Sequence, residues 1–304
     1  MSTATTIDDA KETTTPPHPR KRKKQSSSTR KRSLPITQSL TPTLPSTATR
    51  RIIRRFHTLQ KQLHTLPLHH PTRPHLQHEL DALGGLNTYQ LASQTAATTP
   101  RGGDTSCVFT HYLLSLHLKS YCRANGVKLR GLDVGAVSID TFRDTSAWIE
   151  MTRIDLHAQH PGIFQADFMH ITPEHAPFPC LFDMICLSLV LNFIPEHTTR
   201  GSMLRRLALF LRDRIPERPG PWVYIVLPLP CIENSRYMTE SRMNEEIMGG
   251  LGYTCVYTKT SSKLWYAVYE YLGQENTTNP GQAVVKKKQV NPGVHRNNFC
   301  ISLT

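Results

Sequence analysis

The sequence predicts an α/β fold built on a doubly wound, seven-stranded sheet, with a helical extension before it and disordered tails at both ends. Short apolar runs alternate with amphipathic segments between residues 127 and 272, as expected for successive βαβ units. Residues 181–195 form a long apolar run, which is typical of a central parallel strand covered on both faces. Residues 253–260 and 263–272 have the pattern of a closing antiparallel hairpin.

The first 48 residues are rich in Thr, Ser, Pro, Lys and Arg, and we expect a disordered basic tail because they cannot bury enough apolar surface to offset chain entropy. Residues 1–60 hold 13 Lys/Arg against 3 Asp/Glu, so this region accounts for +10 of the net charge of +13. The basic clusters at residues 19–24 and 30–32 suit nuclear import or contact with phosphates. A merely solvated tail is the alternative.

Residues 49–126 are expected to form a helical extension. A first helix spans residues 50–66, with Ile52, Phe56, Leu59 and Leu63 on one face and arginines beside it, and its basic side could face RNA. A second helical region covers residues 75–93, and a third helix covers residues 107–125 and ends at Gly126.

Two further features of the extension leave alternatives open. We expect a solvated linker at the histidine-rich connector, which holds His69, His70, His75 and His78. A metal site is the less favoured alternative, because prolines interrupt the connector and no cysteine accompanies it. Arg101 lies in a glycine-rich loop. That loop is either only a turn or a flexible segment that closes over a cofactor's carboxylate or over the substrate.

Several classes of protein are disfavoured by composition. The seven cysteines are scattered and contain no C-x-x-C pair, which favours a reducing compartment and argues against a disulfide framework or a zinc site. No apolar run approaches the length of a membrane span, and the polar N-terminus does not resemble a signal peptide. We therefore expect neither a metal nor a membrane among the partners.

Three predicted strands end in residues suited to an adenosine-bearing cofactor. Residues 129–134 are closed by Gly135, which allows a sharp turn and close approach of a ligand. Asp155 ends the next strand, twenty positions on, where a carboxylate can accept hydrogen bonds from both ribose hydroxyls. Asp167 and Phe168 follow a third strand and offer an acceptor for an exocyclic amine beside an apolar ring.

The first turn favours S-adenosylmethionine over a dinucleotide. The pattern G-x-G-x-x-G is missing after residue 135, which argues against NAD or FAD because a pyrophosphate needs close backbone approach. S-adenosylmethionine has no phosphate, and an acidic neighbour such as Asp133 suits its positive charge. In a parallel sheet, ligands bind at the carboxyl ends of the strands. There the apolar run of residues 181–195 carries Ser188 and Asn192.

Five sequence strings resemble the fungal large-subunit (25S) ribosomal RNA adenine-N1 methyltransferase family. They are IDLHAQHP (residues 154–161), QADFM (165–169), LSLVLNFIP (187–195), RGSML (200–204) and LPCIENSRY (229–237). The likeness covers roughly residues 80–272 and implies the Rossmann-like architecture of class I methyltransferases. It also implies S-adenosylmethionine contacts at Gly135 and Asp155, with Asp167, Phe168 and Ser188 completing the pocket.

The family reaction needs positioning of the target more than a catalytic base, because adenine N1 already carries a lone pair. We assign Asn192 the role of orienting the base. The resemblance implies large-subunit ribosomal RNA or a pre-ribosome as partner and a nuclear and nucleolar location. We also expect a monomer, although the sequence itself does not give the oligomeric state. One alternative is an S-adenosylmethionine sensor, as in animal homologues of the family. Another is a methyltransferase for protein or small molecules, which would not need the basic tail.

The predicted domains are therefore a tail at residues 1–48, the helical extension at 49–126 and the methyltransferase domain at 127–272. Residues 273–304 are polar, contain Pro and Gly and carry Lys286-Lys287-Lys288, and we expect them to form a flexible tail.

Overall fold

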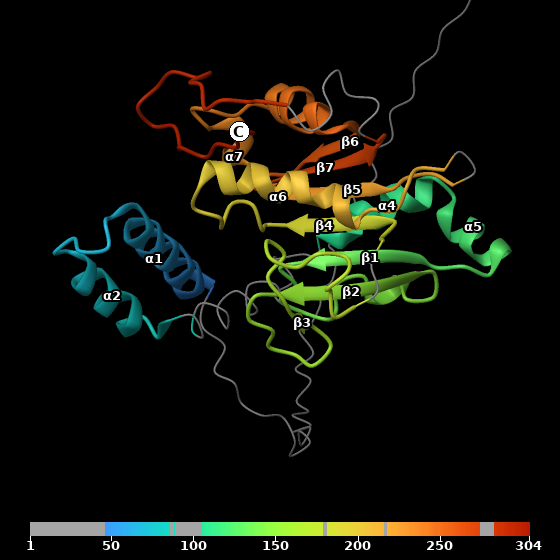
Figure 1. Cartoon of the computed structure of the whole chain (residues 1–304), viewed down its shortest axis with the longest axis horizontal. Coiled ribbons are helices and arrows are strands. Elements are labelled where there is room, and N and C mark those ends of the chain that lie inside the picture. The colour runs from blue at the N-terminus through green and yellow to red at the C-terminus, as the bar shows by residue number, and fades with distance from the viewer. Residues whose placement is uncertain (1–45, 86–87, 89–104, 179–180, 216–217, 274–282) are drawn as a thin grey trace, which may run out of the picture. The chain divides into compact units, whose positions relative to one another are not determined.

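The computed structural model describes residues 46–85, 88, 105–178, 181–215, 218–273 and 283–304. Its sheet has seven strands in the order β3-β2-β1-β4-β5-β7-β6 (Figure 1). The strands are β1 (Leu129–Val134), β2 (Ile149–Asp155), β3 (Phe164–Gln165), β4 (Met184–Ser188), β5 (Trp222–Pro228), β6 (Tyr253–Thr260) and β7 (Leu264–Tyr271). Only β7 runs antiparallel to its neighbours, β5 and β6. The predicted doubly wound, seven-stranded fold is confirmed.

Helices cover both faces of this sheet because its central strands are apolar on both sides. In β5, Val223, Ile225 and Leu227 belong to the core under α6 (His197–Phe210) and the π-helix η2 (Arg242–Met248). The alternate residues Trp222, Tyr224 and Val226 belong to the core under α4 (Ser106–Ser115) and α5 (Leu118–Asn125). The single apolar run in the sequence therefore fills two separate cores.

Two predicted helices differ from the structure. The helix expected at residues 107–125 is broken into α4 and α5, because His117 adopts a left-handed conformation with φ 57°. The sequence between the fifth strand and the closing hairpin also predicts a helix, at residues 235–249. The structure has instead the short helix α7 (Pro230–Glu233), a bend, and then η2 with the 3₁₀ turn η3 (Gly249–Leu251). The Ser235 hydroxyl causes part of this difference. It accepts hydrogen bonds from the backbone N–H groups of Tyr237 and Met238 and donates to the Phe299 carbonyl.

The first described helices form a pair that has its own small core. Helix α1 (Ser46–Thr65) packs on α2 (Arg73–Ala82) through Leu59, Leu63 and Leu76, which confirms the first predicted helix. The Arg73 guanidinium donates to the carbonyls of Leu63 and Leu66, two acceptors left open at the end of α1. A shallow hollow of about 310 Å³ lies beside them and is lined partly by His69 and His70.

The predicted flexible C-terminal tail is wrong for residues 283–304, which we call the 283–304 segment. Phe299, Ile301 and Leu303 are buried in the core under α6, and Leu303 pairs with Val285 in an antiparallel bridge. These apolar side chains stand at alternate positions behind a polar stretch with three lysines. The composition of that stretch led to the prediction of a tail, while the alternation determines the packing.

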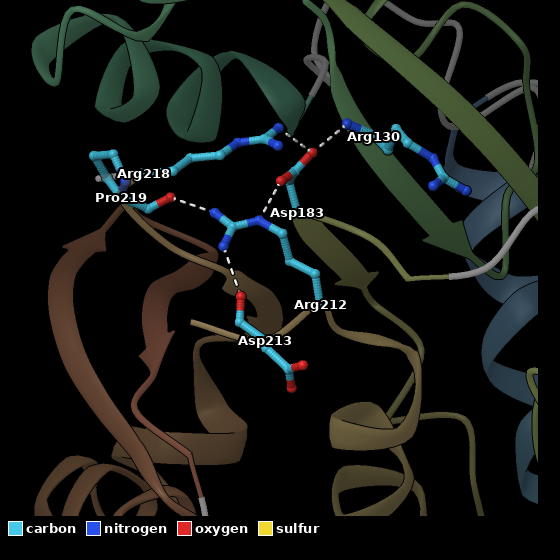
Figure 2. Close-up of polar contacts among 6 residues, drawn as sticks. All are labelled: Arg130, Asp183, Arg212, Asp213, Arg218 and Pro219. Carbon is cyan, nitrogen blue, oxygen red and sulfur yellow. Dashed lines mark hydrogen bonds and ion pairs between the residues drawn. The ribbon is translucent and has the colours of Figure 1, made fainter. Parts of the chain in front are cut away.

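A buried carboxylate fixes the amino ends of the central strands. Asp183, just before β4, accepts a hydrogen bond from the Arg130 backbone N–H at 2.7 Å and contacts the guanidinium groups of Arg212 and Arg218 (Figure 2). Arg212 also donates to the carbonyls of Asp213 and Pro219. This cluster lies at the edge of the sheet opposite the carboxyl ends of the strands. Its role is structural.

None of the helices in the described ranges is long and apolar enough to cross a membrane. Among the same residues, no group of three or more His, Cys, Asp or Glu side chains is arranged to hold a metal ion. The predicted basic tail lies outside the described residues except for its last three positions, which begin α1. The predicted domain boundary near residue 126 stays a prediction.

Candidate functional site

The predicted site residues follow strands that end at one edge of the sheet. Strands β3, β2, β1 and β4 are parallel neighbours, so their carboxyl ends lie side by side. The arrowheads of β2, β1 and β4 in Figure 1 point to the same edge. Gly135 and Ala136 donate backbone hydrogen bonds to the Ile154 carbonyl at 2.8 and 3.0 Å. From β1 the chain proceeds to β2 and β3 on one side, and it then returns to β4 and β5 on the other side. The boundary between β1 and β4 is therefore the topological switch point, where ligands bind in such folds.

Gly135 has a conformation that other residues adopt only with strain. Its φ angle is +74°, and a Cβ atom there would lie 2.8 Å from Cγ2 of Val190, in the turn after β4. The absence of a side chain therefore lets the turns after β1 and β4 come together. Contact between this turn and a cofactor stays a prediction.

Asp155 lies at the end of β2, beside Gln165 of β3. One carboxylate oxygen accepts a hydrogen bond from the His157 backbone N–H at 2.8 Å. Partial burial raises the pKa of Asp155, an effect that the same hydrogen bond opposes. The carboxylate is thus held in place by its own turn, with acceptor capacity left for hydroxyl groups.

Asp167 and Phe168 point in different directions. The Asp167 carboxylate accepts from the Met169 backbone N–H at 2.8 Å and contacts Nδ1 of His170 at 2.7 Å, and its side chain is 39% exposed. The Phe168 ring is buried and packs on Phe210 with ring centroids 5.1 Å apart. The structure therefore accounts for Phe168 by core packing, and its contact with an adenine face stays a prediction.

Asp133 and Ser188 both face the side of the sheet that α4 covers. Asp133 is buried and pairs in register with Cys186 of β4. The Ser188 hydroxyl lies 2.8 Å from Oγ1 of Thr105, whose carbonyl accepts a hydrogen bond from the Tyr224 hydroxyl at 2.6 Å. Thr105, just before α4, is therefore a neighbour of the site that the sequence pattern did not identify as a site residue. Arg101 lies outside the described residues.

Asn192 lies in the turn that follows β4. Its Oδ1 atom is buried and has no hydrogen-bond partner among the described residues, whereas most buried acceptors have one. In the same turn, Leu189 has a left-handed φ of 59°, a conformation that is costly for a branched residue and is typical of functional sites. The turn thus combines backbone strain with an unused acceptor.

Arg200 of α6, which the sequence analysis did not identify as a site residue, fixes this turn. Its Nε atom donates to the carbonyls of Leu191 and Ile194 at 3.0 and 2.9 Å, and Nη2 donates to Pro195 at 3.2 Å. The guanidinium is buried and lies over the Phe299 ring, 4.5 Å from its centroid. Only its place in the RGSML string could have pointed to it, because its partners are backbone groups and one distant ring.

Together these groups match the needs of an adenosyl ligand. A half-buried carboxylate follows β2, a turn without a side chain follows β1, and a buried amide oxygen with no partner in the described structure follows β4. The first suits ribose hydroxyls and the second suits close backbone approach. The third is an acceptor of the kind that an exocyclic amine of a base requires.

The chain resembles one protein family and two named relatives over most of its length. A sequence model of the family described as 25S rRNA (adenine(2142)-N(1))-methyltransferase, Bmt2, matches residues 74–301. A Schizosaccharomyces pombe protein named 25S rRNA adenine-N(1) methyltransferase is 36% identical over 257 residues, which are 83% of this chain and 90% of that protein. A Saccharomyces cerevisiae 25S rRNA (adenine(2142)-N(1))-methyltransferase is 32% identical over 75% of this chain and 63% of its own length.

Methyltransferases are also among the solved structures that resemble this chain at lower sequence identity. The Burkholderia thailandensis 1,6-didemethyltoxoflavin-N1-methyltransferase is 16% identical with a TM-score of 0.40 and covers 68% of this chain and 93% of its own. An rRNA methylase from Escherichia coli is 15% identical with a TM-score of 0.35 and covers 73% and 91%.

The family match spans every described site residue from Asp133 to Asn192, and the Schizosaccharomyces pombe relative is matched over nine-tenths of its length. The chain therefore belongs to the 25S rRNA (adenine(2142)-N(1))-methyltransferase family.

Proposed function

We propose that this protein transfers a methyl group from S-adenosylmethionine to N1 of an adenine in large-subunit (25S) ribosomal RNA. The observation that carries the proposal is the family match over residues 74–301, which includes the whole edge of the sheet from Gly135 to Asn192. Both relatives are named as methyltransferases of 25S rRNA, and nothing found supports the alternative of a sensor without RNA methylation.

The residues at the ends of β1 and β2 would hold the cofactor. Asp155 would accept hydrogen bonds from the ribose hydroxyls, and the backbone at Gly135 would lie against the ligand. Asp133, Ser188 and Asp167 are the other polar side chains at this edge that we assign to the pocket. S-adenosylmethionine supplies an electrophilic methyl group on a sulfonium, so the protein needs to bring a nucleophile into line with it.

Asn192 would orient the target base. Adenine N1 attacks through its own lone pair, and the neighbouring exocyclic N6 group is a hydrogen-bond donor. The buried Oδ1 atom of Asn192 has no partner in the described structure and can accept from N6. As the ring gains positive charge during methyl transfer, N6–H becomes a stronger donor, so this hydrogen bond strengthens in the transition state.

N1 lies on the Watson–Crick edge of adenine, so the target nucleotide must be unpaired or flipped out of a helix. The side chain of Phe193 is 37% exposed and follows Asn192 in the same turn, which places an aromatic ring near the proposed base. We infer that the turn after β4 receives a single unstacked adenine.

The proposal includes a nuclear and nucleolar location, because the clusters at residues 19–24 and 30–32 are the kind of basic sequence that import and RNA binding use. It also includes a monomer that uses no metal. A fluorescent fusion with and without residues 1–45 tests the location. Light scattering of the purified chain tests the oligomeric state, and a chelator added to the assay tests the metal.

The test of function is a labelled-methyl assay with large-subunit RNA, protein and metabolite acceptors offered separately to the purified protein. We expect N1-methyladenosine only in the RNA, detected by mass spectrometry of its nucleosides. Gly135→Arg should abolish the product, because a side chain at this turn is strained and would push Val190 and the turn after β4 away from the proposed cofactor site. Methylation of a protein or a metabolite instead of RNA would refute the proposal.

A second assay separates base orientation from cofactor binding. Asn192→Ala should lower kcat about 10- to 100-fold while the affinity for S-adenosylmethionine stays unchanged, since removal of one preorganised hydrogen bond costs about 1.5–3 kcal/mol when charge develops on a partner. An unchanged kcat would remove Asn192 from the mechanism.

A further inference from the structure

The 283–304 segment is strongly basic and lies beside the proposed site. It contains Lys286, Lys287, Lys288 and Arg296 but no Asp or Glu. All three lysines are exposed. A run of three lysines in a polar tail is usually only solvated, so its position on the folded protein decides whether it has a role.

The segment is attached where the turn after β4 enters α6. The Ser302 backbone N–H donates to the His197 carbonyl at 3.1 Å, and the Ser302 hydroxyl lies 2.7 Å from Nδ1 of His197. Arg200, which holds the turn that carries Asn192, also donates to the Cys300 carbonyl at 2.5 Å. The segment and the proposed base-binding turn thus share one anchor. In Figure 1 the segment lies towards the end to which the β4 arrow points.

The lysines differ from the neighbouring arginines in what their side chains contact. Arg236 donates to Oδ1 of Asn298 and to the Gly293 carbonyl, and Arg296 donates to the Pro292 carbonyl, so both arginines hold the segment itself together. The backbone at Lys286 is fixed by a hydrogen bond from Arg242 to its carbonyl at 2.6 Å. The chain is thus anchored at Lys286, while all three lysine residues are exposed to solvent.

An aromatic side chain completes this surface. The Lys287 ammonium lies over the Tyr237 ring, 4.8 Å from its centroid. Tyr237 closes the LPCIENSRY string after β5, which ends at the same edge of the sheet as β4. Lysines that contact phosphates, next to an aromatic ring on which a base can stack, are the elements of a surface for single-stranded RNA.

We propose that Lys286, Lys287, Lys288 and Tyr237 form an RNA-binding surface that holds the phosphates of nucleotides flanking the target adenine. The inference rests on the proposed function, because it takes the turn at Asn192 as the place of the base. RNA fits this surface better than an acidic protein does. The segment that carries the lysines is anchored through Cys300 and Ser302 beside the turn that receives a base, and the surface combines positive charge with an aromatic ring.

The test compares two variants of the full-length chain in RNA binding. One is Lys286→Gln/Lys287→Gln/Lys288→Gln. The control is Lys119→Gln/Arg123→Gln, which removes exposed charges from α5, the helix that precedes the amino end of β1 at the opposite edge. The probe is a fluorescent single-stranded RNA that contains one adenine in a pyrimidine run, and anisotropy gives Kd at several salt concentrations without any methyl transfer.

We expect the lysine variant to bind at least about tenfold more weakly at about 0.1 M salt and to lose about two units of the salt slope, as for three phosphate contacts at roughly 0.7 each. The α5 control, the melting temperature and the affinity for S-adenosylmethionine should stay near wild type. A separate Tyr237→Leu variant should weaken RNA binding without changing the salt slope.

Unchanged RNA affinity and salt slope in the lysine variant would overturn the inference. So would equal losses in the α5 control, or a loss of binding to an acidic polypeptide with RNA binding intact. Failure of the proposed function has a different result, because wild-type protein would then bind RNA but leave its adenines unmethylated. Binding and methylation are therefore judged by separate measurements.

Discussion

Among the acidic residues that the structure describes, Asp183 is the most deeply buried. It is 2% exposed, and its carboxylate contacts two guanidinium groups and one backbone N–H, which together satisfy its oxygens (Figure 2). A buried charge with such partners is tolerated, but removal of Asp183 leaves two largely buried guanidinium groups without their counter-charge.

Asp183→Asn should therefore lower the free energy of unfolding by about 3–5 kcal/mol, because Arg212 and Arg218 would keep their charges without a carboxylate. Urea unfolding followed by circular dichroism measures the change. The control is Asp213→Asn, which alters an exposed side chain nearby and keeps the carbonyl to which Arg212 donates. Similar urea midpoints for the two variants would show that the cluster is not a stabilising feature.

Asp155 should make cofactor binding depend on pH. Burial raises its pKa above the ordinary value of 3.8, so the folded protein holds the proton more tightly than the unfolded chain. The free energy of unfolding from this group therefore falls as pH rises between 3.8 and the raised pKa. Binding has the opposite dependence, since the ionised carboxylate is the form that accepts hydrogen bonds from both ribose hydroxyls.

Affinity for S-adenosylmethionine should thus decrease as pH is lowered through the raised pKa of Asp155, at a higher pH than an ordinary aspartate would give. Calorimetric titration across the acidic range measures it. Asp155→Asn should bind more weakly and show a flatter profile. If Asp155→Asn retained the full pH dependence of S-adenosylmethionine affinity, another titratable group would be its cause.

At the scale of elements, α6 links three segments that are distant in sequence. Arg200 holds the turn after β4, Arg206 donates to the carbonyls of Phe168 and Ile171 after β3, and Arg205 donates to the Ala283 carbonyl. Each guanidinium satisfies carbonyls that belong to no regular element. The helix therefore fixes the loops at the site as well as covering the sheet.

Gly201 tests this link because no side chain fits there. A Cβ atom would lie 1.9 Å from the Ser302 carbonyl oxygen, which is backbone and cannot turn aside. Gly201→Ala should cost about 1–3 kcal/mol of stability as the 283–304 segment is displaced. It should also lower kcat more than it weakens S-adenosylmethionine binding. Ser202→Ala, at the next and exposed position of α6, is the matched control, and equal behaviour of the two variants would contradict the prediction.

Local patterns predicted the strands and the edge of the sheet where the site lies, because alternation and apolar runs determine which residues enter β1, β2, β4 and β5. They did not predict the role of Arg200, whose partners lie up to a hundred positions away. The prediction of a flexible tail was wrong for the 283–304 segment. It relied on the polar composition and on Lys286-Lys287-Lys288, and it gave too little weight to the alternating apolar residues near the end of the segment. The sequence identified Asn192 from its place after β4. Only the structure shows that its Oδ1 atom is buried without a hydrogen-bond partner among the described residues.

Across the whole molecule, positive charge is concentrated outside the sheet. Residues 1–60 account for +10 of the net +13, and the 283–304 segment adds further lysines without any acidic residue. Such a distribution favours long-range attraction to a polyanion and makes binding sensitive to ionic strength.

Deletion of residues 1–45, which removes nine Lys/Arg and three Asp/Glu, should weaken RNA binding at low salt and reduce the salt slope. It should leave S-adenosylmethionine affinity unchanged, because the site edge begins at β1. Fluorescence anisotropy with RNA and calorimetry with the cofactor measure the two effects. A salt slope equal to that of the full-length chain would show that the tail is only solvated.

Arg200 anchors both the turn at Asn192 and the backbone at Cys300. This shared anchor affects how inherited or selected variants should be interpreted. Substitutions near residue 300, remote from the reacting atoms in sequence, would misplace the target base while the methyl donor still binds. Genetic screens for lost modification should therefore recover two groups of positions, one at the strand ends and one about a hundred residues further along the chain.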